Sequence, residues 1–153
     1  MNEAVDLGLS SGTKWFKYNL GVDYKKLNIN SENSVPEDWY GNYYAWGEIE
    51  PNKLKYTQSK YKWNNKQIST KYNSRDNLEE LLPEDDAARQ FNKLLRIPTV
   101  EECLELLNNT NKSCVYDYNG IKGLNGYIIS NRKDSRKYIF IPAAGLMGGS
   151  KHM

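Results

Sequence analysis

The clearest hydrophobic pattern in the chain is helical and follows Pro98. Thr99 and Glu102 have the spacing of a capping box, in which each residue's side chain accepts a hydrogen bond from the other's backbone N–H at the start of a helix. The apolar residues then recur at helical spacing, as Val100, Cys103, Leu104 and Leu107. The pattern predicts a helix that begins at Thr99, buries this stripe and ends at residues 108–109.

A second helix is predicted just before the first. Pro83 suits the start of a helix, because the first backbone N–H groups of a helix have no partner within it and the missing N–H of proline costs little there. The acidic residues 84–86 suit the same position, because the helix dipole favours negative charge at the N-terminus. Residues 87–91 continue the helix. The same acids could supply oxygen ligands to calcium. Their spacing lacks the alternating pattern of a calcium loop, so helix-terminal charge is the favoured interpretation.

Strand patterns lie at both ends of the chain. Residues 5–9 and 14–19 alternate roughly in polarity around the turn-rich segment 10–13, which predicts a β-hairpin. The last third predicts strands over 114–118, 126–130 and 138–141, with a turn at Asn119-Gly120 and a charged loop at 131–136. The fold class is therefore α+β, with two short helices between groups of strands.

Residues 21–82 show no clear periodicity but contain many large aromatic side chains. A flexible linker would not carry so many rings, so we expect an ordered, loop-rich layer held by buried aromatics. The rings are Trp39, Tyr40, Tyr43, Tyr44, Trp46, Tyr56, Tyr61, Trp63 and Tyr72.

Composition excludes several classes of function. The 153 residues include 21 Lys and Arg and 19 Asp and Glu, and these charges alternate in sign, so no electrostatic case for nucleic acid exists. The longest apolar stretch, 138–147, is interrupted by Pro142 and Gly145 and is too short for membrane insertion. The first residues lack the basic and apolar regions of a secretory signal peptide.

The residues offer little for catalysis or metal binding. Cys103 and Cys114 form no CxxC pair and the single histidine is His152, so neither a zinc site nor a Cys–His catalytic pair is expected. The favoured interpretation is that both cysteines are buried structural thiols, and the alternative is that they form a redox-active pair. Glu79, Glu80 and Glu84 could form an acid–base pair, but nothing fixes their separation. We expect no enzyme, no cofactor and no metal.

The aromatic group at residues 39–46 is the best candidate for ligand binding, because flat rings match the apolar faces of sugars. We expect Trp46 to be part of a packed core. Trp39 and Tyr40, beside residues 36–38, are expected to be more exposed. The candidate ligand-binding residues are Trp39, Tyr40, Tyr43 and Tyr44.

The order of short motifs along the chain resembles a domain that is abundant in surface proteins of Bacteroidetes and their phages. That domain is related to the formylglycine-generating-enzyme and C-type-lectin-like fold. The resemblance covers nearly the whole chain and rests on residues 5–15, 19–21, 36–38, 40–48, 61–63, 71–73, 82–88, 96–102 and 138–145.

This resemblance implies a C-type-lectin-like domain with two short helices, a small twisted antiparallel sheet and long ordered loops. We expect the domain to span residues 3–147, followed by a flexible tail over 148–153, and to be shortened at its C-terminal end relative to the family. Formylglycine-generating enzymes carry a copper-binding cysteine pair in the C-terminal region that this chain lacks, so an oxidase is disfavoured.

The resulting hypothesis is a non-catalytic, lectin-like structural or adhesion module displayed on a phage particle, or alternatively on a bacterial cell surface. The absence of an export signal at the start favours the virion. An open sheet edge would need cover, so we expect a homo-oligomer or a subunit of a larger virion or surface assembly. The alternative is a carbohydrate-binding module of a bacterial envelope protein that binds a cell-surface glycan.

Overall fold

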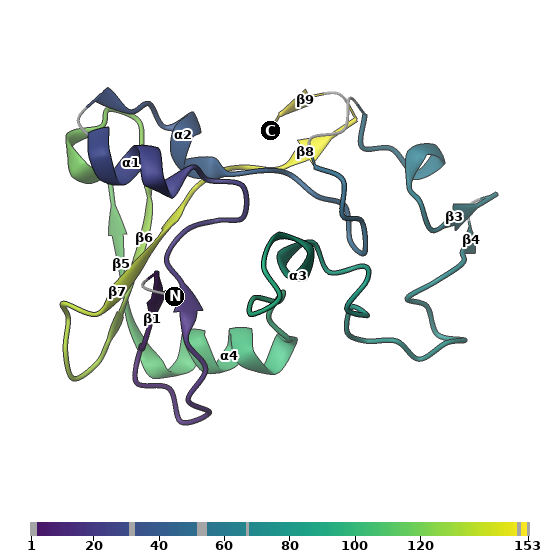
Figure 1. Ribbon diagram of the computed structural model, residues 1–153, viewed down its shortest axis with the longest axis horizontal. Helices are drawn as coiled ribbons and strands as arrows, with labels where there is room; N and C mark the ends of the chain where they lie inside the picture. The colour runs from purple at the N-terminus through teal and green to yellow at the C-terminus, as the bar shows by residue number, and fades with distance from the viewer. Residues whose placement is uncertain (1–2, 31–32, 52–54, 67, 150, 153) are drawn as a thin grey trace. The chain divides into compact units, whose positions relative to one another are not determined.

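The computed structural model describes residues 3–30, 33–51, 55–66, 68–149 and 151–152, and it has a mixed α+β fold (Figure 1). The expected α+β class is therefore confirmed. The chain divides into two compact units, which we describe one at a time: unit 1 comprises Met1–Gly41 and Pro98–Ala144, and unit 2 comprises Asn42–Ile97 and Gly145–Met153. The expected domain boundaries at 3 and 147 stay a prediction.

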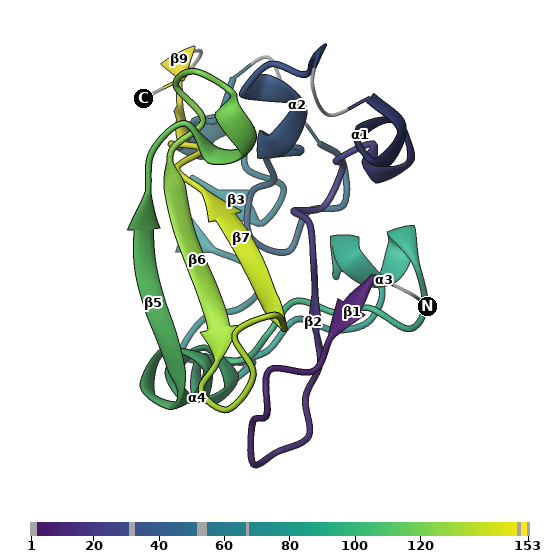
Figure 2. The ribbon, with the colours of Figure 1, turned by 90° about the vertical axis from the view of Figure 1, so that its left-hand side faces the viewer.

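Unit 1 is built around an antiparallel sheet in the order β5–β6–β7 (Figure 2). Its elements are β1 (Ala4–Val5), β2 (Trp15–Phe16), α1 (Tyr24–Asn30), α2 (Glu37–Tyr40), α4 (Val100–Asn109), β5 (Thr110–Val115), η3 (Tyr118–Gly120), β6 (Gly126–Asn131) and β7 (Tyr138–Pro142). The strands predicted over 126–130 and 138–141 are confirmed, whereas the strand predicted over 114–118 overlaps β5 only at residues 114–115. β5 begins four residues earlier than predicted, because α4 runs directly into it.

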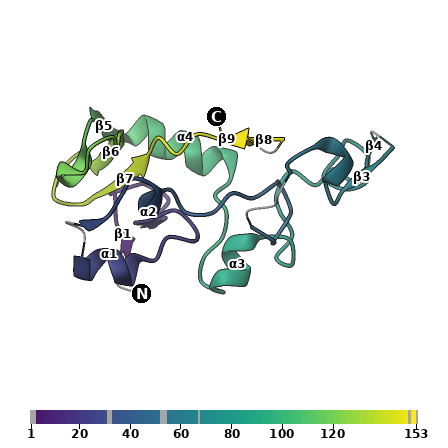
Figure 3. The same cartoon turned by 90° about the horizontal axis from the view of Figure 1, so that it is seen from above.

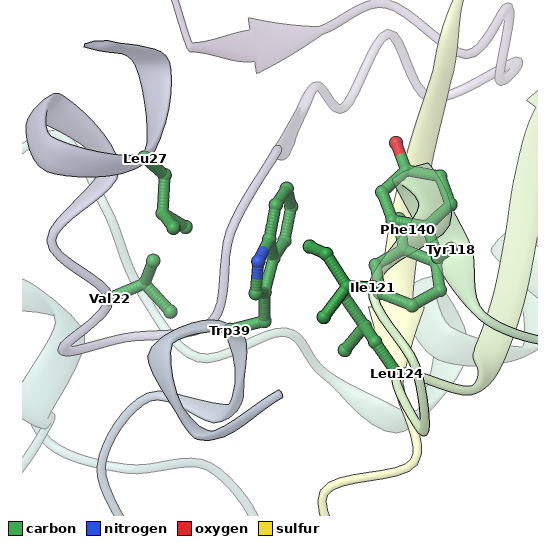
Figure 4. Packing of buried hydrophobic residues seen from close by; sticks show 7 residues of the cluster. All are labelled: Val22, Leu27, Trp39, Tyr118, Ile121, Leu124 and Phe140. Carbon is green, nitrogen blue, oxygen red and sulfur yellow. The ribbon is translucent and has the colours of Figure 1, made fainter. Parts of the chain in front are cut away.

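One face of this sheet carries an aromatic core (Figure 4). Trp39 of α2 packs edge-on against Tyr118 and Phe140, and those two rings stack with centroids 3.9 Å apart. The rest of the buried cluster is aliphatic and consists of Val22, Leu27, Ile121 and Leu124. Helices α1 and α2, which the sequence pattern did not predict, supply Leu27 and Trp39 to this core.

The other face of the sheet packs on the N-terminal segment and α4. Ile129 and Ile139 form a second buried cluster with Leu7, Leu9 and Leu106. The predicted hairpin is confirmed here, although its strands are short: Val5 pairs with Trp15 and Ala4 with Phe16.

Helix α4 confirms its predicted start but not its predicted face. The Thr99 side chain accepts from the Glu102 N–H, and the Glu102 carboxylate accepts from the Thr99 N–H. The stripe expected to be buried is largely exposed, however, with exposed fractions of 70% for Val100, 52% for Leu104 and 47% for Leu107. Leu106 is the residue that α4 buries.

The polar residues of α4 explain which face it turns toward the hairpin. The Glu105 carboxylate accepts from the Ser10 hydroxyl at 2.7 Å and from the backbone N–H of Ser11 at 2.9 Å. The Thr13 hydroxyl donates to Glu102. These bonds hold the 10–13 turn on the same side of the helix as Leu106, so periodicity identified the helix but not the buried side.

Unit 2 consists mainly of loops and short elements. They are η2 (Gln58–Lys60), β3 (Asn64–Asn65), β4 (Ile68–Ser69), α3 (Ala87–Phe91), β8 (Met147–Gly148) and β9 (Lys151–His152). The small β3–β4 hairpin is visible in Figure 3. The expected loop-rich layer agrees with much of this unit, but the rings of that layer that lie in unit 2 are half-buried or, at Trp46, exposed, and not buried as expected.

The last part of unit 2 pairs with its loops. β8 and β9 form a two-stranded pair, and Gly149 exchanges backbone hydrogen bonds with Tyr56. This pairing falls in the segment expected to be a flexible tail, of which residues 150 and 153 lie outside the described residues. The flexibility of that tail remains a prediction.

Candidate functional site

The densest group of charged and aromatic side chains in unit 2 surrounds Asp85, which is 2% exposed. One carboxylate oxygen accepts from the Lys62 ammonium at 3.3 Å. The other accepts from the Lys71 ammonium and, at 2.7 Å, from the Tyr72 hydroxyl. A buried carboxylate is costly unless it is paired and hydrogen-bonded, and Asp85 meets this requirement through residues from two separate loops.

The same two lysines lie over an aromatic ring. The Nζ atoms of Lys62 and Lys71 are 4.2 and 4.7 Å from the centroid of the Trp63 ring. This arrangement lets both cations interact with a π face as well as with the carboxylate. The Trp63 ring also packs edge-on against Tyr72, with centroids 6.1 Å apart.

A third loop, residues 46–48, joins this group through its backbone. The Trp63 indole N–H donates to the Gly47 carbonyl at 2.9 Å, and the Tyr61 hydroxyl donates to the Trp46 carbonyl at 2.8 Å. The carboxylate of Glu48, which is 3% exposed, accepts from the Lys62 backbone N–H at 2.6 Å.

Gly47 has a conformation that glycine favours. Its φ is +69°, and a Cβ atom there would lie 2.8 Å from both the Trp63 indole nitrogen and the Tyr72 ring. The close approach of this backbone to two aromatic rings therefore requires the absence of a side chain.

Asp86 organises the adjoining segment. One of its oxygens caps α3 by accepting from the N–H groups of Ala88 and Arg89, at 2.9 and 3.3 Å. The other oxygen accepts from the Ile97 N–H at 3.0 Å. The helix α3 thus begins at Ala87 rather than near Pro83. Asp85 pairs with Lys62 and Lys71 and does not cap the helix.

We call the residues that meet through these bonds the carboxylate frame: Trp46, Gly47, Glu48, Tyr61, Lys62, Trp63, Lys71, Tyr72, Asp85, Asp86 and Ile97. Burial raises the pKa of Asp85, but the hydrogen bonds from Lys71, Tyr72 and Lys62 outweigh it and leave that pKa below its ordinary value. The hydrogen bond to Asp85 raises the pKa of Lys71. Both groups are therefore charged near neutral pH, which suits a structural ion pair and not a proton-transfer pair.

The expected exposures of the two central tryptophans are reversed. Trp39 is 8% exposed, lies in the aromatic core of unit 1 and donates its indole N–H to Ser34 at 3.0 Å. Trp46, which was expected to be in the core, is 49% exposed. Proximity to the charged residues Glu37 and Asp38 was misleading, because α2 directs Trp39 inward.

The other predicted ligand-binding residues are half-buried. The Tyr40 carbonyl accepts from the Asn19 side chain, and the Tyr43 carbonyl accepts from the Tyr56 hydroxyl. Tyr44 accepts from the Asn42 side chain at 3.3 Å. Trp39 and Tyr40 belong to unit 1, whereas Tyr43 and Tyr44 belong to unit 2. Ligand binding at these four residues stays a prediction.

The cysteines differ from the expected pair of buried thiols. Cys103 is half-buried, and Cys114 is exposed on β5. In the described part of the chain, no group of three or more His, Cys, Asp and Glu side chains is placed to hold a metal ion. Within the same residues, no helix is long and apolar enough to cross a membrane.

Sequence reasoning missed the carboxylate frame as a single site, although it singled out most of its parts. Its parts were noted separately, as aromatic rings of a loop-rich layer, as acids at a helix start and as motifs whose order along the chain carries the family resemblance. The available signal was the recurrence of Lys beside Trp or Tyr, at Lys62-Trp63 and Lys71-Tyr72, ahead of the Asp85-Asp86 pair.

Comparison with known proteins finds no match to a family model, to a curated protein or to a solved structure. The family resemblance therefore rests on the sequence motifs alone.

Proposed function

We propose that this chain is a non-catalytic display module of the C-type-lectin-like fold, carried on the surface of a phage particle or of a bacterial cell as a structural or adhesion component. The observation that carries the proposal is the carboxylate frame. Five of the motifs on which the resemblance rests contribute residues that bond to one another around Asp85 and Asp86.

The carboxylate frame supports the display function because its hydrogen bonds and ion pairs hold the loops of unit 2 in place. Asp85 and Asp86 accept hydrogen bonds from lysine, tyrosine and backbone donors of their own chain. Loops positioned by a rigid scaffold are the usual carriers of binding function, and their exposed side chains can vary without loss of the scaffold. Trp46 of the frame and the nearby Ile49 are large apolar side chains with exposed fractions of 49% and 41%.

The location can be tested directly with an antibody raised against the purified chain. In a culture that produces the chain, we expect immunogold label on intact particles or on unpermeabilised cells. An antibody against a cytoplasmic protein of the same culture serves as the control for intact membranes. Label that appears only after permeabilisation, with particles unlabelled, would contradict the proposal.

A second candidate, a carbohydrate-binding module, is favoured by Trp46. Its ring is half-exposed, its carbonyl is fixed by Tyr61, and the neighbouring Gly47 carbonyl is fixed by Trp63. A ring held on a fixed backbone loses little entropy when a sugar stacks on it. This shifts the candidate stacking residue from Trp39 to Trp46.

A glycan array distinguishes this candidate from simple display. Trp46→Ala should abolish any glycan signal, whereas Phe91→Ala, which removes another exposed aromatic ring of unit 2, should leave it unchanged. Glycan signals that survive Trp46→Ala would exclude Trp46 as the stacking ring, and an array without signals would exclude the carbohydrate-binding candidate.

A further inference from the structure

The three-stranded sheet of unit 1 has an open edge at β5. Among the residues that the structure describes, β6 is the only strand hydrogen-bonded to β5, and Figure 2 shows β5 as the outermost strand of this sheet. The side chains of Asn111, Lys112, Ser113 and Cys114 are all exposed. An exposed strand edge presents backbone N–H and C=O groups that can pair with another chain.

The opposite edge is better protected against such pairing. β7 ends in Pro142, which has no N–H to donate, and its Ile139 and Phe140 are buried. β5 contains no proline and only one charged residue, Lys112. The contrast points to β5 as the edge at which a further strand would add.

A row of solvent-exposed side chains also extends across the sheet to this edge. The register places Cys114 opposite Tyr127 and Tyr127 opposite Ile141, so the three lie side by side on one face. Tyr127 is 53% exposed and Ile141 is 37% exposed, whereas Ile129 and Ile139 on the same face are covered by the second core cluster. The exposed row thus ends at the open edge.

We propose that β5 pairs with β5 of a second copy of this chain, antiparallel and about a two-fold axis at Ser113, to form a continuous six-stranded sheet. The inference rests on the proposed function of a structural component and on the expectation, drawn from the sequence, that the chain is part of a homo-oligomer or larger assembly. The pairing adds to the proposed function the identity of the partner, the strand that pairs and the register of the pairing.

Geometry restricts the register. Backbone groups along one strand edge point outward at every second residue, so two copies of one edge can place directly opposite each other only residues of equal parity. Three arrangements satisfy this rule near the middle of β5, with the two-fold axis at Lys112, at Ser113 or at Cys114.

Charge and overlap select among these three. An axis at Lys112 places two lysines directly opposite each other, which is unfavourable. An axis at Cys114 leaves only residues 113–115 of β5 in the pairing. An axis at Ser113 pairs residues 111–115, places Lys112 opposite the uncharged Cys114 of the second copy, and sets two small hydroxyl side chains against each other.

The register can be tested by charge exchange at Ser113. Ser113→Glu and Ser113→Lys each set like charges opposite each other and should weaken self-association about tenfold or more, as measured by light scattering over a concentration series. An equimolar mixture of the two variants should recover the dimer. Asn111→Glu is the matched control, because residue 111 faces Val115 of the second copy, and it should weaken association much less.

Cross-linking checks the same register independently. In a Cys103→Ser, Cys114→Ser background, Ser113→Cys should form a disulfide-linked dimer on mild oxidation, because directly opposed residues of antiparallel strands have Cα atoms about 4.5–5.5 Å apart. Asn111→Cys in that background should not cross-link.

The outcomes separate this inference from the proposed function. Efficient cross-linking of the wild-type chain through Cys114 would overturn the Ser113 register, and a wild-type chain that stays monomeric over the whole concentration series would overturn the pairing. A monomer that still labels the surface of particles or cells would leave the display function standing.

Discussion

The two units of this chain bury different kinds of side chain. Among the described residues, the buried hydrophobic side chains lie in unit 1, except for Ala87 and Ala88. Unit 2 instead buries three carboxylates, Glu48, Asp85 and Asp86. Unit 1 is therefore stabilised mainly by removal of apolar surface from water, and unit 2 mainly by hydrogen bonds and ion pairs around these acids.

This contrast shows how a loop-rich unit with few buried apolar side chains can be ordered. Each carboxylate accepts hydrogen bonds from segments that are distant in sequence, such as residues 62, 71 and 97. One acid thus fixes several loops at once. The cost is that such a frame depends on every partner being present, because a charge left unpaired in a buried position is strongly destabilising.

The largest expected effect is a truncation in unit 1. Leu124 is fully buried, so Leu124→Ala should lower the free energy of unfolding by about 2–5 kcal/mol through lost burial and a cavity. Urea denaturation measures this change. Leu104→Ala on the exposed face of α4 is the control, with an expected change within about 0.5 kcal/mol. Equal effects of the two variants would contradict the apolar core assigned to unit 1.

The second prediction concerns the carboxylate frame. Asp85→Asn keeps the shape of the side chain but leaves Lys71 and Lys62 without their counter-charge, so we expect a loss of about 2–4 kcal/mol. Hydrogen exchange should rise in residues 42–97 and stay unchanged in residues 98–144.

Asp134→Asn provides the matched control, because Asp134 pairs with the exposed Arg136. A surface pair of this kind contributes little. If Asp85→Asn proved as mild as Asp134→Asn, the frame would not stabilise unit 2.

A smaller effect is expected at Gly47. Gly47→Ala adds a Cβ that overlaps the Trp63 and Tyr72 rings at a positive φ, and should cost about 1–3 kcal/mol. Gly12→Ala has a similar φ of +75° but no atom within 4 Å of the added Cβ. It should cost about 1 kcal/mol, so the difference between the two variants in thermal unfolding measures the close packing alone. A vanishing difference would argue against that packing.

The smallest predicted effect lies in the capping box of α4. Thr99→Ala removes the acceptor for the Glu102 N–H and should cost about 1 kcal/mol, whereas Thr99→Ser should retain most of it. Calorimetry can compare the two variants. Equal stability of both would show that this cap does not contribute.

The sequence predicted features that depend on neighbours along the chain. The capping box at Thr99, the hairpin around residues 10–13 and the strands over 126–130 and 138–141 follow from local patterns, and the structure confirms them. The exposure of Trp39 and Trp46 and the buried side of α4 depend on distant residues. Local patterns could not determine them.

The recurrence of Lys beside Trp or Tyr hinted at the parts of the carboxylate frame, but which of these residues contact one another could not be predicted, for the same reason. Its bonds join residues 11–23 positions apart, from Ile97 and Asp86 to Lys62 and Asp85. No periodicity relates them, since they lie in loops. The acids at 84–86 were interpreted as helix-terminal charge, which holds for Asp86 but not for Asp85.

The most direct test of the difference between the units is an acid titration followed by the indole N–H signals of Trp39 and Trp63 in NMR spectra. The pKa of Asp85 is lowered in the folded state, so folded Asp85 binds fewer protons than unfolded Asp85. Its stabilisation is present above the unfolded value of about 4 and is lost as the pH falls below it toward the folded value.

Trp63 donates to Gly47 within the frame, whereas Trp39 donates to Ser34 beside the apolar core. We predict that the Trp63 signal shifts or broadens below about pH 4 while the Trp39 signal keeps its folded position. Simultaneous loss of both signals, or earlier loss of Trp39, would contradict the conclusion that buried carboxylates hold unit 2 and apolar packing holds unit 1.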